Sequence, residues 1–142
     1  MALIAYADTS LLVPLFARDV FNQAARHFLT TQRPALIVSD FTCAELASAL
    51  AKKLRMRELS LAEARRALST FDGWMATRSP RVETSAADIA LAEAHLRRLD
   101  LSLRTPDAVH IAIAQRHGAP LATFDVRMSD AAKALGLALA PV

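Results

Sequence analysis

The chain has 142 residues, of which 54% are hydrophobic and 22% are charged, a length and composition typical of one compact globular domain. Its single cysteine, Cys43, excludes an internal disulfide, and no cluster of cysteine and histidine with zinc-site spacing surrounds it. The formal net charge of +3, from 17 Lys and Arg against 14 Asp and Glu, permits a nucleic-acid partner without demonstrating one.

The first residues carry neither the pattern of an export signal nor that of a membrane span. Met1 leads directly into an apolar run, with no basic region and no cleavage site. The longest early apolar stretch, residues 11–17, contains Pro14 and is far shorter than the roughly 20 residues that cross a bilayer. We therefore expect a cytoplasmic protein that is not embedded in a membrane.

The first part of the chain alternates between short apolar runs and helical patterns. In chain order we predict a strand at 2–7, helices at 10–16 and about 20–31, a strand at 35–38, and a helix from 41 to about 55. In the last of these helices, apolar residues recur every three or four positions, as on one face of a helix. Ser39 or Asp40 is suited to cap it.

The second part of the chain continues this alternation. In chain order we predict helices at 60–75, 85–99, 105–117 and 129–135, and short strands at 81–84, 121–123 and 137–140. Ser60 with Glu63 is a capping-box signature. Thr105 is a good N-cap before Pro106, and Gly118 ends the helix that follows.

Alternation of strands and helices predicts a parallel sheet with helices on both faces. The sequence has no linker, internal repeat or low-complexity segment that would divide it. We therefore predict a single α/β domain over residues 1–142, with a parallel sheet of four to five strands.

Two acids directly follow predicted strands. Asp8 follows the first strand, and Asp125 follows the strand at 121–123. In open α/β sheets ligands bind outside the carboxyl ends of the strands, so both acids should reach the same edge of the sheet. Ser10 and Thr123 are small hydroxyl residues beside them that can orient a carboxylate. For Asp8 alone, an N-cap of the following helix is an equally good interpretation.

Two further acids lie in predicted helices. Asp107 is in the first turn of its helix, where the helix dipole favours an acid for structural reasons. Glu45 is in the middle of a helix among apolar residues, with no Lys or Arg three or four positions later to pair with. A solvated position at the helix edge is the ordinary explanation for such a Glu.

Taken together, four carboxylates without neighbouring cations would repel one another and raise their own pKa values, so a positive charge must compensate. Ligands that are all oxygen suit Mg²⁺ or Mn²⁺, which keep several waters and often a substrate phosphate. Such ions activate water for phosphodiester hydrolysis. The sequence therefore favours a metal-dependent phosphodiesterase.

Other polar residues are less informative. His110 lies one turn after Asp107, where it can orient that carboxylate or simply pack in the core. Basic residues flank two of the acids in the sequence and are candidate phosphate contacts, although a solvated surface is their default interpretation. They are Lys52, Lys53, Arg55 and Arg57 after the Glu45 helix, and Arg104 before Asp107.

Four segments, each with its acid, resemble the PIN-domain toxins called VapC in order and spacing. They are YADTSLL at 6–12, AEL at 44–46, TPDAVH at 105–110 and ATFD at 122–125. The resemblance implies a PIN-like parallel sheet flanked by helices and an endoribonuclease dependent on Mg²⁺ or Mn²⁺. It also implies a homodimer, and an antitoxin partner that joins it in larger assemblies.

The resemblance also assigns roles to individual residues. Asp8 and Asp107 would be the principal metal ligands, and Glu45 and Asp125 would complete a catalytic site of four acids. Ser10 and Thr123 would support these carboxylates. On this hypothesis the chain is the toxin of a type II toxin–antitoxin pair and hydrolyses RNA.

Two alternatives remain open. A phosphotransferase with an aspartate nucleophile would explain Asp8, but the position two residues later is Ser10, and no lysine directly follows a late strand. A non-catalytic dimeric binding module, whose acids only cap helices, would explain Asp107 well and Glu45 poorly.

Overall fold

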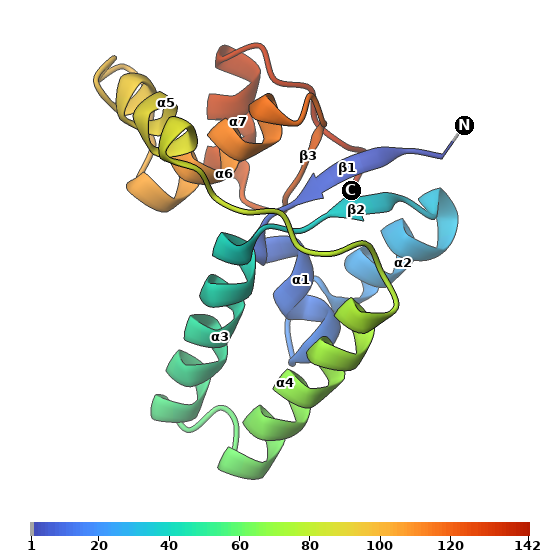
Figure 1. The fold of residues 1–142 in the computed structure, drawn as a ribbon. Helices are drawn as coiled ribbons and strands as arrows, with labels where there is room; N and C mark the ends of the chain where they lie inside the picture. The colour runs from blue at the N-terminus through green and yellow to red at the C-terminus, as the bar shows by residue number, and fades with distance from the viewer. Residues whose placement is uncertain (1) are drawn as a thin grey trace.

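The computed structural model describes residues 2–142 as seven helices around a parallel sheet of three strands (Figure 1). The strands are β1 (Ile4–Ala7), β2 (Ala35–Ile37) and β3 (Leu121–Ala122). The helices are α1 (Thr9–Phe16), α2 (Asn22–Gln32), α3 (Asp40–Arg55), α4 (Leu61–Ala76), α5 (Ala86–Leu96), α6 (Thr105–Arg116) and α7 (Val126–Ala134). The strand order is β2-β1-β3 with both pairings parallel, which confirms the predicted α/β class.

The central strand β1 is buried on both faces. Ala5 and Ala7 belong to a hydrophobic core shared with α1 to α4, and Tyr6 belongs to a second core shared with α5, α6 and α7. Because successive side chains of a strand point to opposite faces, this alternation places a helical layer on each side of the sheet. Figure 1 shows α1 to α4 on one side of the strands and α5 to α7 on the other.

The sheet is narrower than the predicted four to five strands. Segments 81–84 and 137–140, both predicted as strands, each contribute only one parallel bridge, at Val82 and at Leu139. In the first segment, the N–H of Thr84 is bound by a side-chain carboxylate instead of a neighbouring strand. A backbone donor used in this way cannot extend a ladder, so the segment stays an extended loop.

Side-chain caps decide where several helices begin, including α4 and α7. The Ser60 hydroxyl accepts the N–H of Glu63, and the Glu63 carboxylate accepts the N–H of Ser60, which is the predicted capping box of α4. The helix predicted at 129–135 begins earlier, at the start of α7. There the Asp125 carboxylate accepts the N–H of Met128 and so provides the cap.

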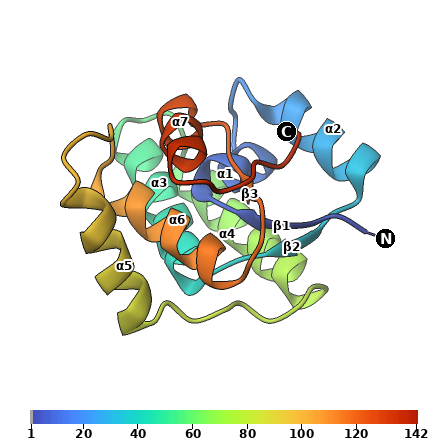
Figure 2. The same ribbon diagram turned by 90° about the horizontal axis from the view of Figure 1, so that it is seen from above.

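Helix α6 forms the centre of the second core. All its residues from 107 to 114 are buried, so it lacks the polar face of a surface helix. It ends before Gly118, whose φ of +61° favours glycine. Helix α5 lies alongside it (Figure 2), and Arg116 of α6 forms an ion pair with Asp88 of α5. Within residues 2–142, no helix is both long enough and apolar enough to cross a bilayer.

Candidate active site

The four predicted acids come from four different parts of the fold and line one cavity of about 230 Å³. Asp8 follows β1, and Asp125 lies just beyond β3, so both are at the carboxyl edge of the sheet. Asp107 is in the first turn of α6, and Glu45 is in the second turn of α3. The structure therefore brings all four predicted residues to the place where α/β sheets bind ligands.

Asp8 is the most deeply buried of the four acids, with 1% of its surface exposed. Its Oδ1 accepts hydrogen bonds from the Ser10 hydroxyl at 2.8 Å and from the N–H of Leu11 at 3.1 Å. Its Oδ2 accepts one from the Thr123 hydroxyl at 2.6 Å. Burial raises the pKa of Asp8, although nearby His110 and these hydrogen bonds oppose the rise.

No ion pair in the described part of the chain, residues 2–142, includes Asp8. Its charge is met by hydroxyl and amide dipoles and not by a cation in contact. The two hydroxyl residues that the sequence singled out, Ser10 and Thr123, therefore do contact this carboxylate. They also contact each other, with 3.1 Å between Ser10 Oγ and Thr123 Oγ1.

Asp107 and Asp125 each cap a helix. Asp107 caps α6, in which it lies, and Asp125 caps α7, which follows it. Oδ2 of Asp107 accepts the N–H of Arg104 at 3.0 Å, so this acid, and not the predicted Thr105, satisfies the start of α6. Oδ1 of Asp125 accepts the N–H of Met128 at 3.1 Å. Within residues 2–142, the other oxygen of each carboxylate accepts no hydrogen bond from the protein, so it is available to a ligand.

Within residues 2–142, Glu45 caps no helix and is held by side chains alone. Its Oε1 accepts a hydrogen bond of 2.7 Å from the Thr9 hydroxyl and also contacts Nε2 of His110. Burial alone would raise the pKa of Glu45, but the hydrogen bonds from His110 and from the Thr9 hydroxyl lower it below its ordinary value. The sequence offers Glu45 no basic partner three or four positions later in α3. In the structure its partner is His110, which comes from α6.

His110 does not contact the carboxylate that its sequence position suggested. It points to Glu45 instead of Asp107, and its other nitrogen, Nδ1, lies 2.8 Å from the Tyr6 hydroxyl. Tyr6 is a residue that sequence reasoning missed. The available signal was a phenol in the middle of an otherwise apolar strand, because a buried Tyr needs a hydrogen-bond partner.

Of the basic residues that the sequence suggested as phosphate contacts, Arg104 lines the cavity. Its Nε lies 3.6 Å from Oδ2 of Asp107, and 65% of its side chain is exposed. The other four lie in the last turn of α3 or just beyond it, remote from Glu45 along the helix. One of them, Lys53, donates to Glu58 and to the carbonyl of Arg18.

The acids surround the cavity without closing on a common point. Among residues 2–142, no three His, Cys, Asp or Glu side chains are close enough to hold a metal ion by themselves. The donor set nevertheless suits Mg²⁺, which is commonly held by one or two carboxylates while waters and substrate phosphates fill its other positions. Because the available oxygens belong to carboxylates, the residues present fit such an ion.

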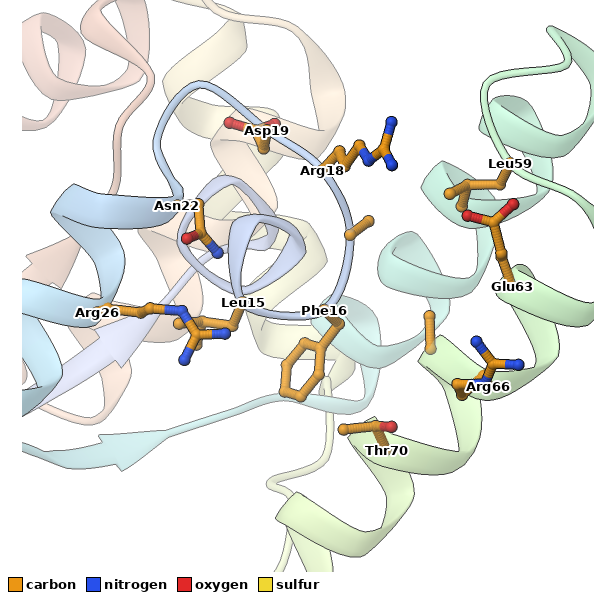
Figure 3. A pocket seen from close by; sticks show the side chains of 12 residues that line it. Leu15, Phe16, Arg18, Asp19, Asn22, Arg26, Leu59, Glu63, Arg66 and Thr70 are labelled. Carbon is orange, nitrogen blue, oxygen red and sulfur yellow. The ribbon is translucent and has the colours of Figure 1, made fainter.

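A second cavity is larger, about 580 Å³, and lies between the end of α1, the start of α2, and α4 (Figure 3). Arginines 18, 26 and 66 line it together with apolar residues such as Phe16. Of its two acids, Glu63 is already used in the cap of α4. The larger cavity thus lacks the grouped carboxylates of the smaller one, and chemistry rather than size identifies the candidate site.

Comparison with known proteins gives a consistent result. A family model described as the PIN domain matches residues 5–134. Ribonuclease VapC46 of Mycobacterium tuberculosis is 37% identical over 137 residues, which cover 94% of each chain. The crystal structure of VapC20 from the same species, a toxin that cleaves the sarcin-ricin loop, has a TM-score of 0.73 at 21% identity, covering 96% of this chain and 98% of the other. VapBC2 of Rickettsia felis, bound to promoter DNA, has a TM-score of 0.68 at 15% identity, covering 97% and 98%.

Proposed function

Since the chain belongs to the PIN-domain family and, within it, to the VapC ribonucleases, we propose that it is a cytoplasmic metal-dependent endoribonuclease. On this proposal it is the toxin of a type II toxin–antitoxin pair. The observation that carries the proposal is the single cavity lined by Asp8, Glu45, Asp107 and Asp125. Asp8 is buried there without a cation in contact, although burial of an uncompensated charge is costly.

Mg²⁺ or Mn²⁺ is the cofactor that this donor set favours. Asp8 and Asp107 would be its principal ligands, with Glu45 and Asp125 completing the acidic site. A divalent ion held by these residues would supply a lower pKa for a coordinated water and positive charge for a phosphate.

The protein's own residues have distinct roles in this proposal. Ser10 lies within hydrogen-bond distance of both oxygens of the Asp8 carboxylate and Thr123 donates to Oδ2, so together they hold the group in one orientation. Arg104 is largely exposed at the cavity, where its guanidinium can contact an RNA phosphate. The free oxygens of Asp107 and Asp125 face a ligand without losing the caps that their other oxygens provide.

The test is cleavage of RNA by the purified chain with Mg²⁺ or Mn²⁺ and with excess EDTA. We expect cleavage to require the ion. Glu45→Gln, Asp107→Asn and Asp125→Asn should each remove most cleavage while the circular dichroism spectrum stays that of the wild type. Full activity of Asp107→Asn would contradict the site assignment.

A partner protein that covers the acidic site is the second element of the proposal. Solved relatives of this fold include VapBC2 of R. felis and a toxin–antitoxin complex from Klebsiella pneumoniae. An antitoxin that places an Arg or Lys among the four acids would replace the positive charge of the ion and block phosphate binding together. The toxin itself would be a homodimer, within a larger assembly when the antitoxin binds.

Co-expression with the adjacent upstream open reading frame tests this element. We expect its product to restore growth, to co-purify with the chain, and to compete with Mg²⁺ for the site. Equal binding to Asp8→Asn with and without excess Mg²⁺ would count against occlusion of the acids. Harmless expression and the absence of a binding partner would refute the toxin role while leaving the nuclease proposal intact.

The non-catalytic alternative has one observation in its favour, because three of the four acids do cap helices. It predicts no effect of Mg²⁺ on the unfolding midpoint, whereas an ion held only by the folded state must raise that midpoint. The phosphotransferase alternative has no comparable support, since no lysine lines the cavity within residues 2–142.

A further inference from the structure

A continuous chain of side-chain hydrogen bonds leads from the interior of the protein to Glu45. Ser39 Oγ lies 2.8 Å from the Tyr6 hydroxyl, which lies 2.8 Å from Nδ1 of His110. The opposite nitrogen, Nε2, contacts the Glu45 carboxylate, whose side chain is 28% exposed at the cavity. His110 itself is 1% exposed. The chain thus joins a fully buried anchor to a side chain of the acidic site.

Counting hydrogens determines the direction of these bonds. An ionised carboxylate only accepts, so Nε2 of His110 must carry a hydrogen that it donates to Glu45. When the imidazole is neutral it has one hydrogen, so Nδ1 accepts and the Tyr6 hydroxyl donates to it. The Tyr6 oxygen in turn accepts from a hydroxyl donor, and Ser39 is the neighbour able to supply it. The Thr42 hydroxyl already donates to the carbonyl of Ala7.

We propose that His110, fixed by Tyr6, is a positioning residue that holds the Glu45 carboxylate ready to bind the divalent ion. This inference rests on the proposed function, because it concerns how one of the four acids is presented. Asp8, Asp107 and Asp125 are each oriented by backbone N–H groups near them. Glu45 has a longer side chain and accepts no backbone hydrogen bond within residues 2–142, so its orientation depends on side chains from other elements.

The geometry of the imidazole makes a matched pair of substitutions possible. A Gln at this position places its amide group near Nε2, so His110→Gln keeps a donor to Glu45. An Asn places its amide near Nδ1, so His110→Asn keeps the contact with Tyr6 and loses the one with Glu45. Both side chains are uncharged amides, and both leave a polar group in the same buried position. Comparing the two variants therefore separates the effect of losing the contact with Glu45 from the effect of changing the stability of the core.

The experiment measures Mn²⁺ affinity by isothermal titration calorimetry without RNA, together with thermal unfolding of the ion-free proteins. Loss of a group that orients a metal ligand typically weakens metal affinity about 10–100-fold. We expect His110→Asn to weaken Mn²⁺ binding by about 10-fold or more, and His110→Gln to restore it close to the wild-type value. Equal affinities of the two variants, whether both normal or both weakened, would overturn the inference.

Glu45→Gln separates failure of this inference from failure of the proposed site. If Glu45→Gln and His110→Asn both weaken Mn²⁺ binding, the inference is supported. If only Glu45→Gln does so, the acid binds the ion without help from His110, and the inference fails alone. If Glu45→Gln has no effect, both the role of Glu45 and the inference are refuted.

Tyr6→Phe provides the second variant in case His110→Asn does not fold. It keeps the ring in the core and removes only the hydroxyl that donates to Nδ1. We expect its Mn²⁺ affinity to lie between those of the wild type and Glu45→Gln. A wild-type affinity in a folded Tyr6→Phe protein would show that the phenol is not needed to position the imidazole.

Discussion

Asp8 and Asp88 are two aspartates with the same exposure, 1%, and opposite electrostatics. Asp88 accepts hydrogen bonds from Arg116 at 2.7 and 2.9 Å, and its carboxylate also accepts the N–H of Ser85. Although burial opposes it, the contact with Arg116 lowers the pKa of Asp88. Among residues 2–142, Asp8 has only hydroxyl and amide partners, and burial raises its pKa.

The difference shows which of the two buried acids has its charge compensated by the protein itself. Asp88 has its cation already, so it joins α5 to α6 and needs nothing from outside. Asp8 has hydrogen bonds that fix its orientation but lacks the charge that would offset its burial. A buried acid in that condition is typical of a functional site. The following predictions test whether this contrast holds in solution.

The largest expected effect is on RNA cleavage. Removing a residue that hydrogen-bonds a metal ligand typically lowers activity roughly 10–100-fold. Asp8→Asn removes a proposed ligand itself, so it should reduce the cleavage rate with Mg²⁺ by more than that. Asp88→Asn should keep a wild-type rate when it is assayed well below its unfolding midpoint. Asp19→Asn, in the larger cavity, is the matched control and should also cleave normally. A fully active Asp8→Asn would remove the contrast between the two acids.

The second effect is on stability without metal, and its sign differs between the acids. Asp88→Asn breaks a charged hydrogen-bond pair, so it should lower the free energy of unfolding by about 2 kcal/mol, or roughly 4–8 °C in midpoint. Asp8→Asn removes a buried charge that has no cation, so its midpoint should equal or exceed that of the wild type. Calorimetry in EDTA measures both, and a large loss in Asp8→Asn would contradict the electrostatic account.

The third effect is on the pH dependence of stability, measured by urea unfolding of the metal-free protein. The raised pKa of Asp8 means that the folded state binds its proton more tightly, so stability falls as pH rises above the ordinary value of 3.8. The lowered pKa of Asp88 has the opposite sign, so its contribution is lost as pH falls below 3.8. Asp8→Asn should flatten the pH dependence of stability above pH 3.8, and Asp88→Asn should flatten it below pH 3.8. Unchanged profiles would refute these directions.

The smallest effect concerns Arg104, a cation beside the acids that remains largely exposed. RNA binding should weaken as salt rises, because Lys and Arg contacts with phosphates release counterions. Replacing Arg104 by Gln in a cleavage-deficient protein should reduce the slope of log affinity against log salt by about 0.7, the value for one phosphate contact with a single strand. An unchanged slope would mean that Arg104 does not contact the phosphate backbone of the RNA.

Much of this architecture follows from local sequence patterns. The α/β alternation, the capping box at Ser60, and the place of Asp8 after a strand are all determined within a few neighbouring residues. The gathering of the four acids is predicted by the rule that strand ends share an edge, together with the family resemblance. These features could be read from the sequence because short-range rules decide them.

The features that sequence reasoning missed depend on contacts between distant segments. His110 lies one turn from Asp107, yet its partner is Glu45, 65 positions away along the chain. The strand predicted at 81–84 does not form because the Asp40 carboxylate binds the N–H of Thr84, a contact that apolar content alone does not reveal. The sequence predicts Asp125 as a site residue, but it does not predict that Asp125 caps α7.

The strand order β2-β1-β3 also has a consequence for synthesis in the cell. The first strand occupies the middle of the sheet, and one of its neighbours is contributed by residues near the other end of the chain. Thr123, which binds Asp8, belongs to that late segment. A chain emerging from the ribosome therefore carries Asp8 and Ser10 long before Thr123, the second hydroxyl residue that orients Asp8. On the proposed function, the acidic site is therefore completed only when synthesis of the chain is almost finished.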